Sequence, residues 1–326
     1  MYFTRLIGLG FAACKASTLN NLLTLNNSKE KGKDFPFSLL LSALNRNFAA
    51  MKRLLFVATL VFLTVSAFSQ KAPAPIKADL WTNGSAPNSN GDVKDTAQVY
   101  IYLAPQNHNT GRAIVICPGG GYQHLSMKNE GHDWAEFFQG QGITAVVLKY
   151  RMPHKHPEVP ISDAEAAMKL VRLNAANWGV KTDQVGIMGF SAGGHLASTI
   201  ATKSKGDAKP NFQILFYPVI SMIEGITHQG SLENLLGKRA SKKMQKQYSS
   251  DIQVSRVTPR AFICLADDDH AVLPANSISY YTELYKHDVP VTFHTYPRGG
   301  HGFGFRQSFA NHIEMVLELK SWLNSF

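Results

Sequence analysis

After residue 97 the chain alternates short apolar runs with segments of helical spacing. The apolar runs are mostly continuous stretches of Val, Ile, Leu, Ala and Phe, which is the pattern of strands buried on both faces of a sheet. Seven of them are expected to form strands, at residues 98–103, 113–117, 143–150, 185–188, 212–217, 261–265 and 291–296.

Two segments between and after these runs carry apolar residues at intervals of three and four, the spacing of a helix that packs one face on a core. The first is marked by Ala164, Ala167, Met168, Val171 and Ala175. The second, near the C-terminus, is marked by Phe309, Ile313, Val316, Leu317 and Leu323. The alternation predicts the α/β fold class, with a mostly parallel central sheet and helices on both faces. Ligands of such sheets bind at the carboxyl ends of the strands.

One stretch interrupts the alternation. Residues 220–258 are polar, basic in the middle, and lie between two predicted strands, so we expect an insertion that covers or borders the active site. The chain has no internal repeat and no second hydrophobic core. Residues 98–326 are therefore expected to form one domain, preceded by a lead-in over 70–97 that is rich in Pro, Gly and Asn.

The N-terminal part has the pattern of an export signal. A basic start at residues 51–53 precedes an apolar run over 54–67, and Ala67-Phe68-Ser69 supplies the small residues of a cleavage site. We predict a signal peptide over 51–69, a mature chain from Gln70 and an exported protein. The run is shorter than the roughly 20 residues of a membrane-spanning helix, so no membrane contact is expected after cleavage. Residues 1–50 are expected to be an over-extended start or, alternatively, a genuine leader.

Setting aside residues 1–69 lowers the net charge of the remaining chain. The whole chain is formally +10, but residues 1–69 hold eight Lys and Arg against two Asp and Glu. The rest has 25 basic and 21 acidic residues, a net charge of +4 without a dense basic stripe, so nucleic acid is not an expected partner. Beyond the leader, the cysteines are Cys117 and Cys264, each in an apolar run, and both are expected to be buried and unpaired.

The strongest chemical signal is the sequence Gly-Phe-Ser-Ala-Gly-Gly at 189–194, directly behind the apolar run at 185–188. A strand, a tight turn with a serine and a helix beginning at Ala192 form the setting in which G-x-S-x-G presents a nucleophile. Gly189 and Gly193 leave room for so sharp a turn. We therefore predict Ser191 as the nucleophile.

A serine hydroxyl needs a base, and the candidate is His301, in a glycine-rich loop after the last predicted strand. An acid is expected after the preceding strand, where Asp267, Asp268 and Asp269 follow one another. A metal site there is disfavoured, because adjacent aspartates point in different directions and no second ligand cluster stands out. The order serine, aspartate, histidine is that of α/β-hydrolases.

A loop that can stabilise negative charge follows the strand at 113–117. Its sequence Cys-Pro-Gly-Gly-Gly-Tyr at 117–122 places backbone N–H groups, those of Gly119 and Gly120, where an oxyanion would form, together with that of Ala192. A phosphate-binding loop is disfavoured, because neither a following Lys-Ser/Thr nor a downstream ribose-binding acid is present.

Together these motifs resemble the α/β-hydrolase family, and within it the exported bacterial carbohydrate esterases of the acetyl-xylan and feruloyl esterase type. Further matching blocks span about residues 98–323 and include Glu130-Gly131, 148–153, 186–198 and 296–302. The resemblance favours Asp269 as the triad acid, with Asp268 as the alternative. Pro118, where the hormone-sensitive-lipase-like branch has histidine, argues against that branch.

The resemblance implies a serine esterase, free of cofactor and metal, that acts on acyl esters of plant-wall saccharides. The substrate would be a small-molecule or oligosaccharide ester whose acyl group, acetyl or feruloyl, depends on how 220–258 folds. Two alternatives stay open: a prolyl-oligopeptidase-like peptidase, whose usual propeller has no room here, and a non-catalytic carbohydrate-binding protein on a hydrolase scaffold. His195 is interpreted as structural, and 149–151 as a buried polar support.

Overall fold

The computed structural model describes residues 74–82 and 85–326. The predicted leader over 1–50, the signal peptide over 51–69 and Gln70 lie outside these residues. The chain divides into two units by its internal contacts, Met1–Lys71 and Ala72–Phe326, and the described residues all belong to the second. In the described part, no helix is long and apolar enough to cross a membrane.

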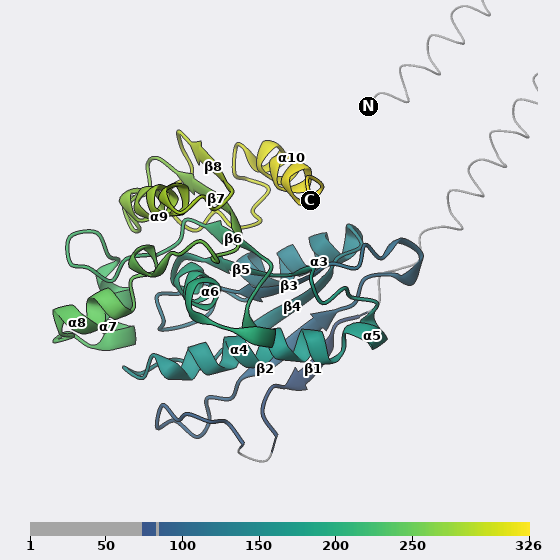
Figure 1. Ribbon diagram of the computed structural model, residues 1–326, viewed down its shortest axis with the longest axis horizontal. Helices are drawn as coiled ribbons and strands as arrows, with labels where there is room; N and C mark the ends of the chain where they lie inside the picture. Colours follow the sequence, from purple (N-terminus) through teal and green to yellow (C-terminus); the bar gives the residue numbers. More distant parts are fainter. Residues whose placement is uncertain (1–73, 83–84) are drawn as a thin grey trace, which may run out of the picture. The chain divides into compact units, whose positions relative to one another are not determined.

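Eight strands form one sheet in the order β1-β2-β4-β3-β5-β6-β7-β8, with β1 and β2 at one edge and β8 at the other (Figure 1). The strands from β4 through β8 in this order are parallel, whereas β2 is antiparallel to both of its neighbours. Their bounds are β1 Ile76–Asp79, β2 Gln98–Tyr102, β3 Ala113–Cys117, β4 Thr144–Lys149, β5 Val185–Phe190, β6 Phe212–Phe216, β7 Arg260–Ala266 and β8 Val291–Tyr296. The predicted fold class is confirmed, and the seven predicted strands end within two residues of the observed ones.

Strand β1 was not predicted and lies inside the expected lead-in over 70–97. Three of its four residues are exposed, and it pairs with β2 at the edge of the sheet, where Gln98 of β2 also donates to the Asp79 carboxylate. Such a strand needs no apolar run, because it buries little side-chain surface. The hydrophobic pattern therefore gave no signal for it.

Helices cover both faces of the sheet, because neighbouring residues of a strand point to opposite sides. On one face, Trp134 of α3 packs against the rings of Phe190 and Phe216, and Trp322 of α10 packs against Phe212. The other face carries α4, α6 and α9. The main helices are α3 Asp133–Gly140, α4 Glu158–Leu173, α5 Ala175–Trp178, α6 Ser191–Lys203, α7 Gln229–Leu236, α8 Lys242–Gln247, α9 Ala275–Lys286 and α10 His312–Leu323.

The two helices predicted from spacing are present. In α4 the marked residues from Ala164 to Val171 are buried, as the pattern predicts. In α10 the predicted packing face is confirmed only in part: Leu323 is buried and Val316 packs against the core, but Ile313 and Leu317 are exposed. Met315, Leu319 and Trp322 are buried instead. Apolar residues lie on both sides of this helix, so spacing alone did not identify the buried side.

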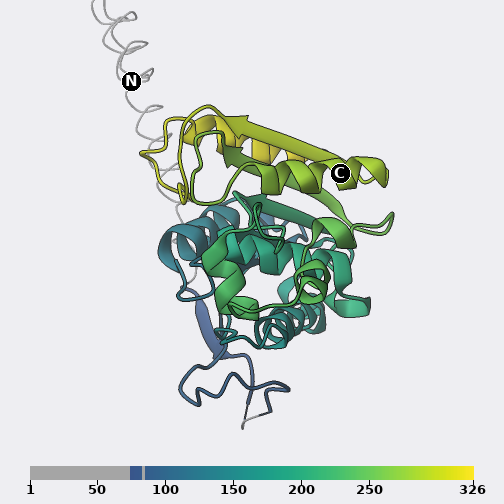
Figure 2. The same ribbon diagram turned by 90° about the vertical axis from the view of Figure 1, so that its left-hand side faces the viewer.

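The predicted insertion over 220–258 contains α7, α8 and the short 3-10 helix η5, Asp251–Gln253. Its helices α7 and α8 lie at one end of the strands in Figure 1, and Figure 2 views the domain from that end. The side-chain oxygen of Asn276 in α9 accepts hydrogen bonds from the backbone N–H groups of Ile220 and Ser221, which fixes the start of the insertion.

The polar residues at 149–151 support neighbouring loops. The buried Arg151 guanidinium forms a salt bridge with Asp163 at 2.7 Å, and the Tyr150 hydroxyl donates to the carbonyl of Pro118 at 2.8 Å. Lys149 is half-buried and donates to the carbonyl of Thr96. The predicted buried support thus consists of Tyr150 and Arg151.

Cys117 and Cys264 are both buried and unpaired, as predicted. They lie on β3 and β7, which are separated in the sheet by β5 and β6. Burial raises the pKa of both thiols, so neither is a reactive thiolate at neutral pH.

His195, in α6, connects three segments from a fully buried position. Its Nδ1 is 2.8 Å from the Tyr122 hydroxyl and its Nε2 is 2.6 Å from the carbonyl of Tyr248. A carbonyl only accepts, so Nε2 carries the proton and Nδ1 accepts from the hydroxyl. The ring ties the insertion to the loop after β3, a structural role as predicted. Burial lowers its pKa to about 4.

This low pKa predicts a pH-dependent stability. Between the usual histidine pKa of about 6.5 and a pKa of about 4, the unfolded chain binds a proton at His195 that the folded chain does not. The contribution of His195 to the free energy of unfolding is therefore fully present above this pH window. It falls, by at most about 3 kcal/mol, as the pH drops through the window. Denaturant unfolding at pH 7 and pH 4.5 should show that the free energy of unfolding falls less between these pH values in His195→Gln than in the wild type. Equal losses in both proteins would contradict the assignment.

Candidate active site

Ser191 lies at the turn between β5 and α6 in a strained backbone conformation. Its φ is 51°, a left-handed value that is rare for residues other than glycine. The turn is tight because α6 lies close to β5 and β3: a Cβ at Gly193 would come within 2.1 Å of the carbonyl oxygen of Cys117. The sequence prediction of a sharp strand–turn–helix at this serine is confirmed.

The structure brings the three predicted triad side chains into one line. The Ser191 hydroxyl is 2.9 Å from His301 Nε2, and His301 Nδ1 is 2.7 Å from Asp269 Oδ2. Asp269 is buried, and its other oxygen accepts from the backbone N–H groups of Ala271 and Val272, each at 2.9 Å. The carboxylate is therefore fixed as an acceptor, which holds the proton on Nδ1 and leaves Nε2 free to accept the serine proton.

The three consecutive aspartates have separate positions. Asp269 contacts the imidazole, whereas Asp268 Oδ1 accepts from the backbone N–H groups of Gly299 and Gly300 at 2.9 and 2.7 Å. Asp267 is exposed. Asp268 thus holds the loop that carries His301, while Asp269 holds its ring.

The loop after β3 has an unusual backbone. Gly120, Gly121 and Tyr122 have successive positive φ values of 135°, 65° and 57°. A Cβ at Gly120 would come within 2.1 Å of the carbonyl oxygen of His124, so only glycine fits there. The loop lies against the nucleophile, because a Cβ at Gly119 would be 2.9 Å from that of Ser191.

The structure corrects the predicted set of oxyanion donors. The N–H of Gly119 donates to the Glu130 carboxylate at 2.8 Å, so it is not free for a substrate oxygen. The N–H of Gly120 has no partner within residues 74–82 and 85–326. Ala192 lies in the first turn of α6, where N–H groups have no partner within the helix. Gly120 and Ala192 therefore remain as the candidate donors.

Glu130 is a buried carboxylate to which the motif Glu130-Gly131 alone assigned no role. It lies in a short π-helix, Lys128–His132. One oxygen accepts from Gly119 N–H, and the other accepts from the Tyr217 hydroxyl at 2.8 Å. Burial raises the pKa of Glu130, and these two hydrogen bonds oppose the rise. Both oxygens act as acceptors, the pattern of an ionised carboxylate.

Tyr217 continues this network to the histidine loop. Its hydroxyl accepts from the N–H of Gly304 at 2.9 Å, and its ring meets the His301 ring edge-on, with 4.9 Å between centroids. Glu130 and Tyr217 together join the loop after β3 to the loop after β8. Both loops are thereby held against the nucleophile.

His228, at the start of α7, brings the insertion to the site. Its Nδ1 accepts from Ser231, which caps the helix and leaves the proton on Nε2. Its ring would be 3.8 Å from a Cβ on Gly121. Burial first, and then nearby His301, lower its pKa, so the ring is neutral at neutral pH. The expectation that 220–258 borders the site is met by this residue.

The arrangement can perform nucleophilic acyl transfer. A serine, a base and an acid lie in line, with two N–H groups where an oxyanion would develop. Throughout residues 74–82 and 85–326, no group of three His, Cys, Asp or Glu side chains is placed to hold a metal ion.

Comparisons with known proteins agree with this geometry. Residues 114–305 match a family described by the alpha/beta hydrolase fold. The chain is 41% identical to an acetylxylan esterase of Xylanibacter ruminicola over 279 residues, 84% of this chain and 55% of that protein. It is 30% identical over 207 residues to an endo-1,4-beta-xylanase B of Butyrivibrio fibrisolvens, 58% of this chain and 32% of that protein. The chain thus spans about half or less of these relatives.

Among solved structures, it is similar to an acetyl ester-xyloside bifunctional hydrolase from Caldicellulosiruptor lactoaceticus. The TM-score is 0.72 at 32% sequence identity, over 79% of this chain and 98% of that one. Unlike the two relatives above, this protein is matched over nearly its whole length.

The contacts of the aspartates predict the effects of two substitutions. Asp269→Asn should lower kcat by up to about 10⁴-fold, because the amide favours the wrong imidazole tautomer. Asp268→Asn should have a far smaller effect, since its amide oxygen can still accept from Gly299 and Gly300. The measurement is kcat on an aryl acetate, with thermal melts to confirm folding. Should Asp268→Asn be the inactive variant, the assignment of the acid would be wrong.

The buried hydrogen bonds of Glu130 and Tyr217 predict that substitutions away from the serine lower kcat. In Glu130→Gln one of the two contacts faces an NH₂ group instead of an oxygen, leaving a buried donor unpaired at a cost of about 1–3 kcal/mol. We expect kcat on an aryl acetate to fall by about 10–100-fold with little change in KM. Tyr217→Phe, which removes the hydroxyl from the same network, should also lower kcat. A KM effect with unchanged kcat would contradict a positioning role.

Proposed function

The chain belongs to the alpha/beta hydrolase fold family, and from this premise we propose that it is a serine esterase that removes acyl groups, acetyl above all, from xylan-derived saccharides. The proposal is carried by the line of hydrogen bonds from Asp269 through His301 to Ser191. The names of three similar proteins support the substrate class, since each refers to xylan, xylanase or xyloside chemistry.

In the first half of the proposed reaction, Ser191 Oγ attacks the ester carbonyl carbon while His301 Nε2 takes its proton. The carbonyl oxygen becomes an oxyanion that accepts hydrogen bonds from the N–H groups of Gly120 and Ala192. Each such donor typically lowers the barrier by about 2.7–4 kcal/mol. The tetrahedral intermediate then breaks its bond to the saccharide oxygen, which leaves with the proton from His301.

In the second half, water attacks the acyl-serine ester. His301 takes a proton from the water and returns it to Ser191 Oγ as the carboxylic acid departs. Asp269 stays ionised throughout and stabilises the positively charged imidazolium. Glu130 and Tyr217 do not touch the reacting atoms; they hold the two loops in place.

Export is part of the proposal. A polymer such as xylan is met outside the cell, which fits the signal peptide predicted over 51–69. That segment lies outside the described residues.

The proposal predicts a substrate ranking. Purified protein is assayed in parallel on acetylated xylo-oligosaccharides, methyl ferulate and a peptide amide, with acetate release expected to be fastest. Ser191→Ala should abolish turnover of all esters, whereas Ser308→Ala, at an exposed serine, should match the wild type. Faster cleavage of the amide would favour a peptidase. Activity that survives in Ser191→Ala would refute the nucleophile.

A further inference from the structure

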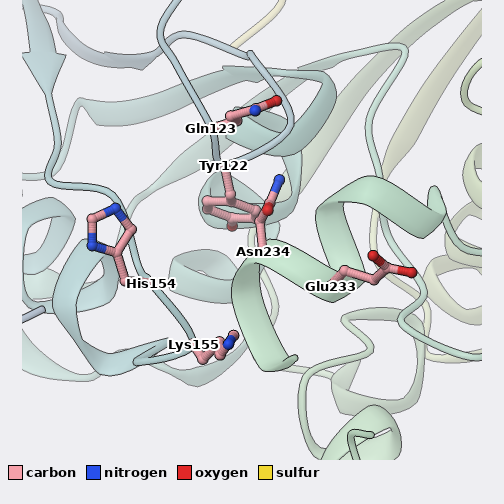
Figure 3. A pocket seen from close by; sticks show the side chains of 6 residues that line it. All are labelled: Tyr122, Gln123, His154, Lys155, Glu233 and Asn234. Carbon is pink, nitrogen blue, oxygen red and sulfur yellow. The ribbon is translucent and has the colours of Figure 1, made fainter. Parts of the chain in front are cut away.

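A pocket lined by polar residues lies beside the loop after β3 that carries Gly120, which we call the oxyanion loop. Its volume is about 320 Å³, at the small end of ligand-binding pockets. It is formed where the loops after β3 and β4 meet helix α7, and Figure 3 shows Tyr122 and Asn234 at its centre. The lining residues are Tyr122, Gln123, His154, Lys155, Glu233 and Asn234.

Helix α7 connects this pocket to the reacting atoms. His228, at its N-terminus, borders the site next to Gly121 and His301, while Asn234 lies in its second turn and lines the pocket. At 1.5 Å per residue the two positions are about 9 Å apart along the helix. Asn234 Nδ2 donates to the carbonyl of Gly121 at 2.8 Å, so the pocket and the oxyanion loop share a wall.

Several polar groups of the pocket have no partner within the protein. Within residues 74–82 and 85–326, no hydrogen bond or ion pair is made by the side chains of Gln123, His154 or Lys155 or by the Oδ1 atom of Asn234. Glu233 differs, because its carboxylate accepts from Gln229 and points away from Tyr122 (Figure 3). The unpartnered groups offer both donors and acceptors.

The backbone that carries two of these groups is strained. His154 and Lys155 have φ values of 45° and 72°, and left-handed residues in succession are costly without glycine. The N–H of Lys155 donates to the backbone carbonyl of Asn234 at 3.0 Å, which locks the loop against α7. Strain that is held in place in this way is typical of ligand sites.

We propose that this pocket is a subsite for a sugar ring of the saccharide that carries the scissile ester, recognised through its hydroxyl groups. The inference rests on the proposed function and specifies where the saccharide lies. A sugar ring presents hydroxyls that both donate and accept, which matches the mixture of Gln123, His154, Lys155 and Asn234 Oδ1. The Tyr122 ring is 2% exposed, so hydrogen bonding rather than ring stacking provides the recognition.

The test removes two of these side chains without disturbing the reacting atoms. His154→Gly deletes the ring at a position whose φ suits glycine, and Gln123→Ala deletes an exposed amide. Asn234 is left intact because it also holds Gly121. The matched control is His156→Ala with Gln307→Ala, two exposed side chains that do not line the pocket.

The readout is the ratio of kcat/KM on acetylated xylotriose to kcat/KM on 4-nitrophenyl acetate, which has no saccharide. We expect the double variant to lower this ratio by about 10–100-fold, as for one or two lost hydrogen bonds, mainly through KM for the saccharide. The control pair should keep the wild-type ratio.

Two other outcomes overturn the inference and differ in what they leave standing. If the wild type cleaves both substrates and the double variant keeps its ratio within twofold, the subsite is refuted and the esterase proposal stands. If the wild type cleaves 4-nitrophenyl acetate but not acetylated xylotriose, the proposed saccharide substrate is refuted, and the subsite with it.

Discussion

The geometry of the site depends on one buried carboxylate. The nucleophile and the Ala192 N–H are held by the sheet and α6, but the other oxyanion donor, Gly120, and the base lie on the loops after β3 and β8. Glu130 contacts the first loop at Gly119 and, through the Tyr217 hydroxyl, reaches the second at Gly304. A carboxylate removed from water is costly unless both oxygens are satisfied, so the two loops must be present together for Glu130 to be accommodated. The charge therefore selects the arrangement in which the oxyanion loop and the histidine face the serine.

The parts that the sequence predicted are those with a local signal. Most of the parallel strands are buried, apolar runs, and Ser191, Asp269 and His301 come shortly after the ends of β5, β7 and β8. The parts that it missed depend on partners distant in the chain or on exposed backbone. Strand β1 has no apolar pattern, and Glu130 acquires its role from Tyr217, 87 residues away. The hydrogen bond from the Gly119 N–H to Glu130 and the position of His228 beside Gly121 could not be predicted either, because neither follows from the spacing of residues.

The insertion between β6 and β7 is an integral part of the fold. Asn276 holds its first residues, His195 holds Tyr248 near its end, and Asn234 in its middle contacts the oxyanion loop. Three attachments along the segment favour a fixed wall over a mobile cover. The site thus has two origins. The reacting residues belong to the sheet and its loops, whereas the insertion contributes His228 beside Gly121 and Asn234 in the proposed sugar subsite.

The separation of the site residues along the chain has a consequence for biosynthesis. Ser191 precedes His301 by 110 residues, and Asp269 precedes His301 by 32. Contacts between such distant positions form late, because the intervening loops must close first. As the polypeptide emerges from the ribosome, the serine is complete while the strand that will deliver its base has not been translated. A serine without its base is a poor nucleophile, so the chain is chemically harmless to other esters until its last strand has docked.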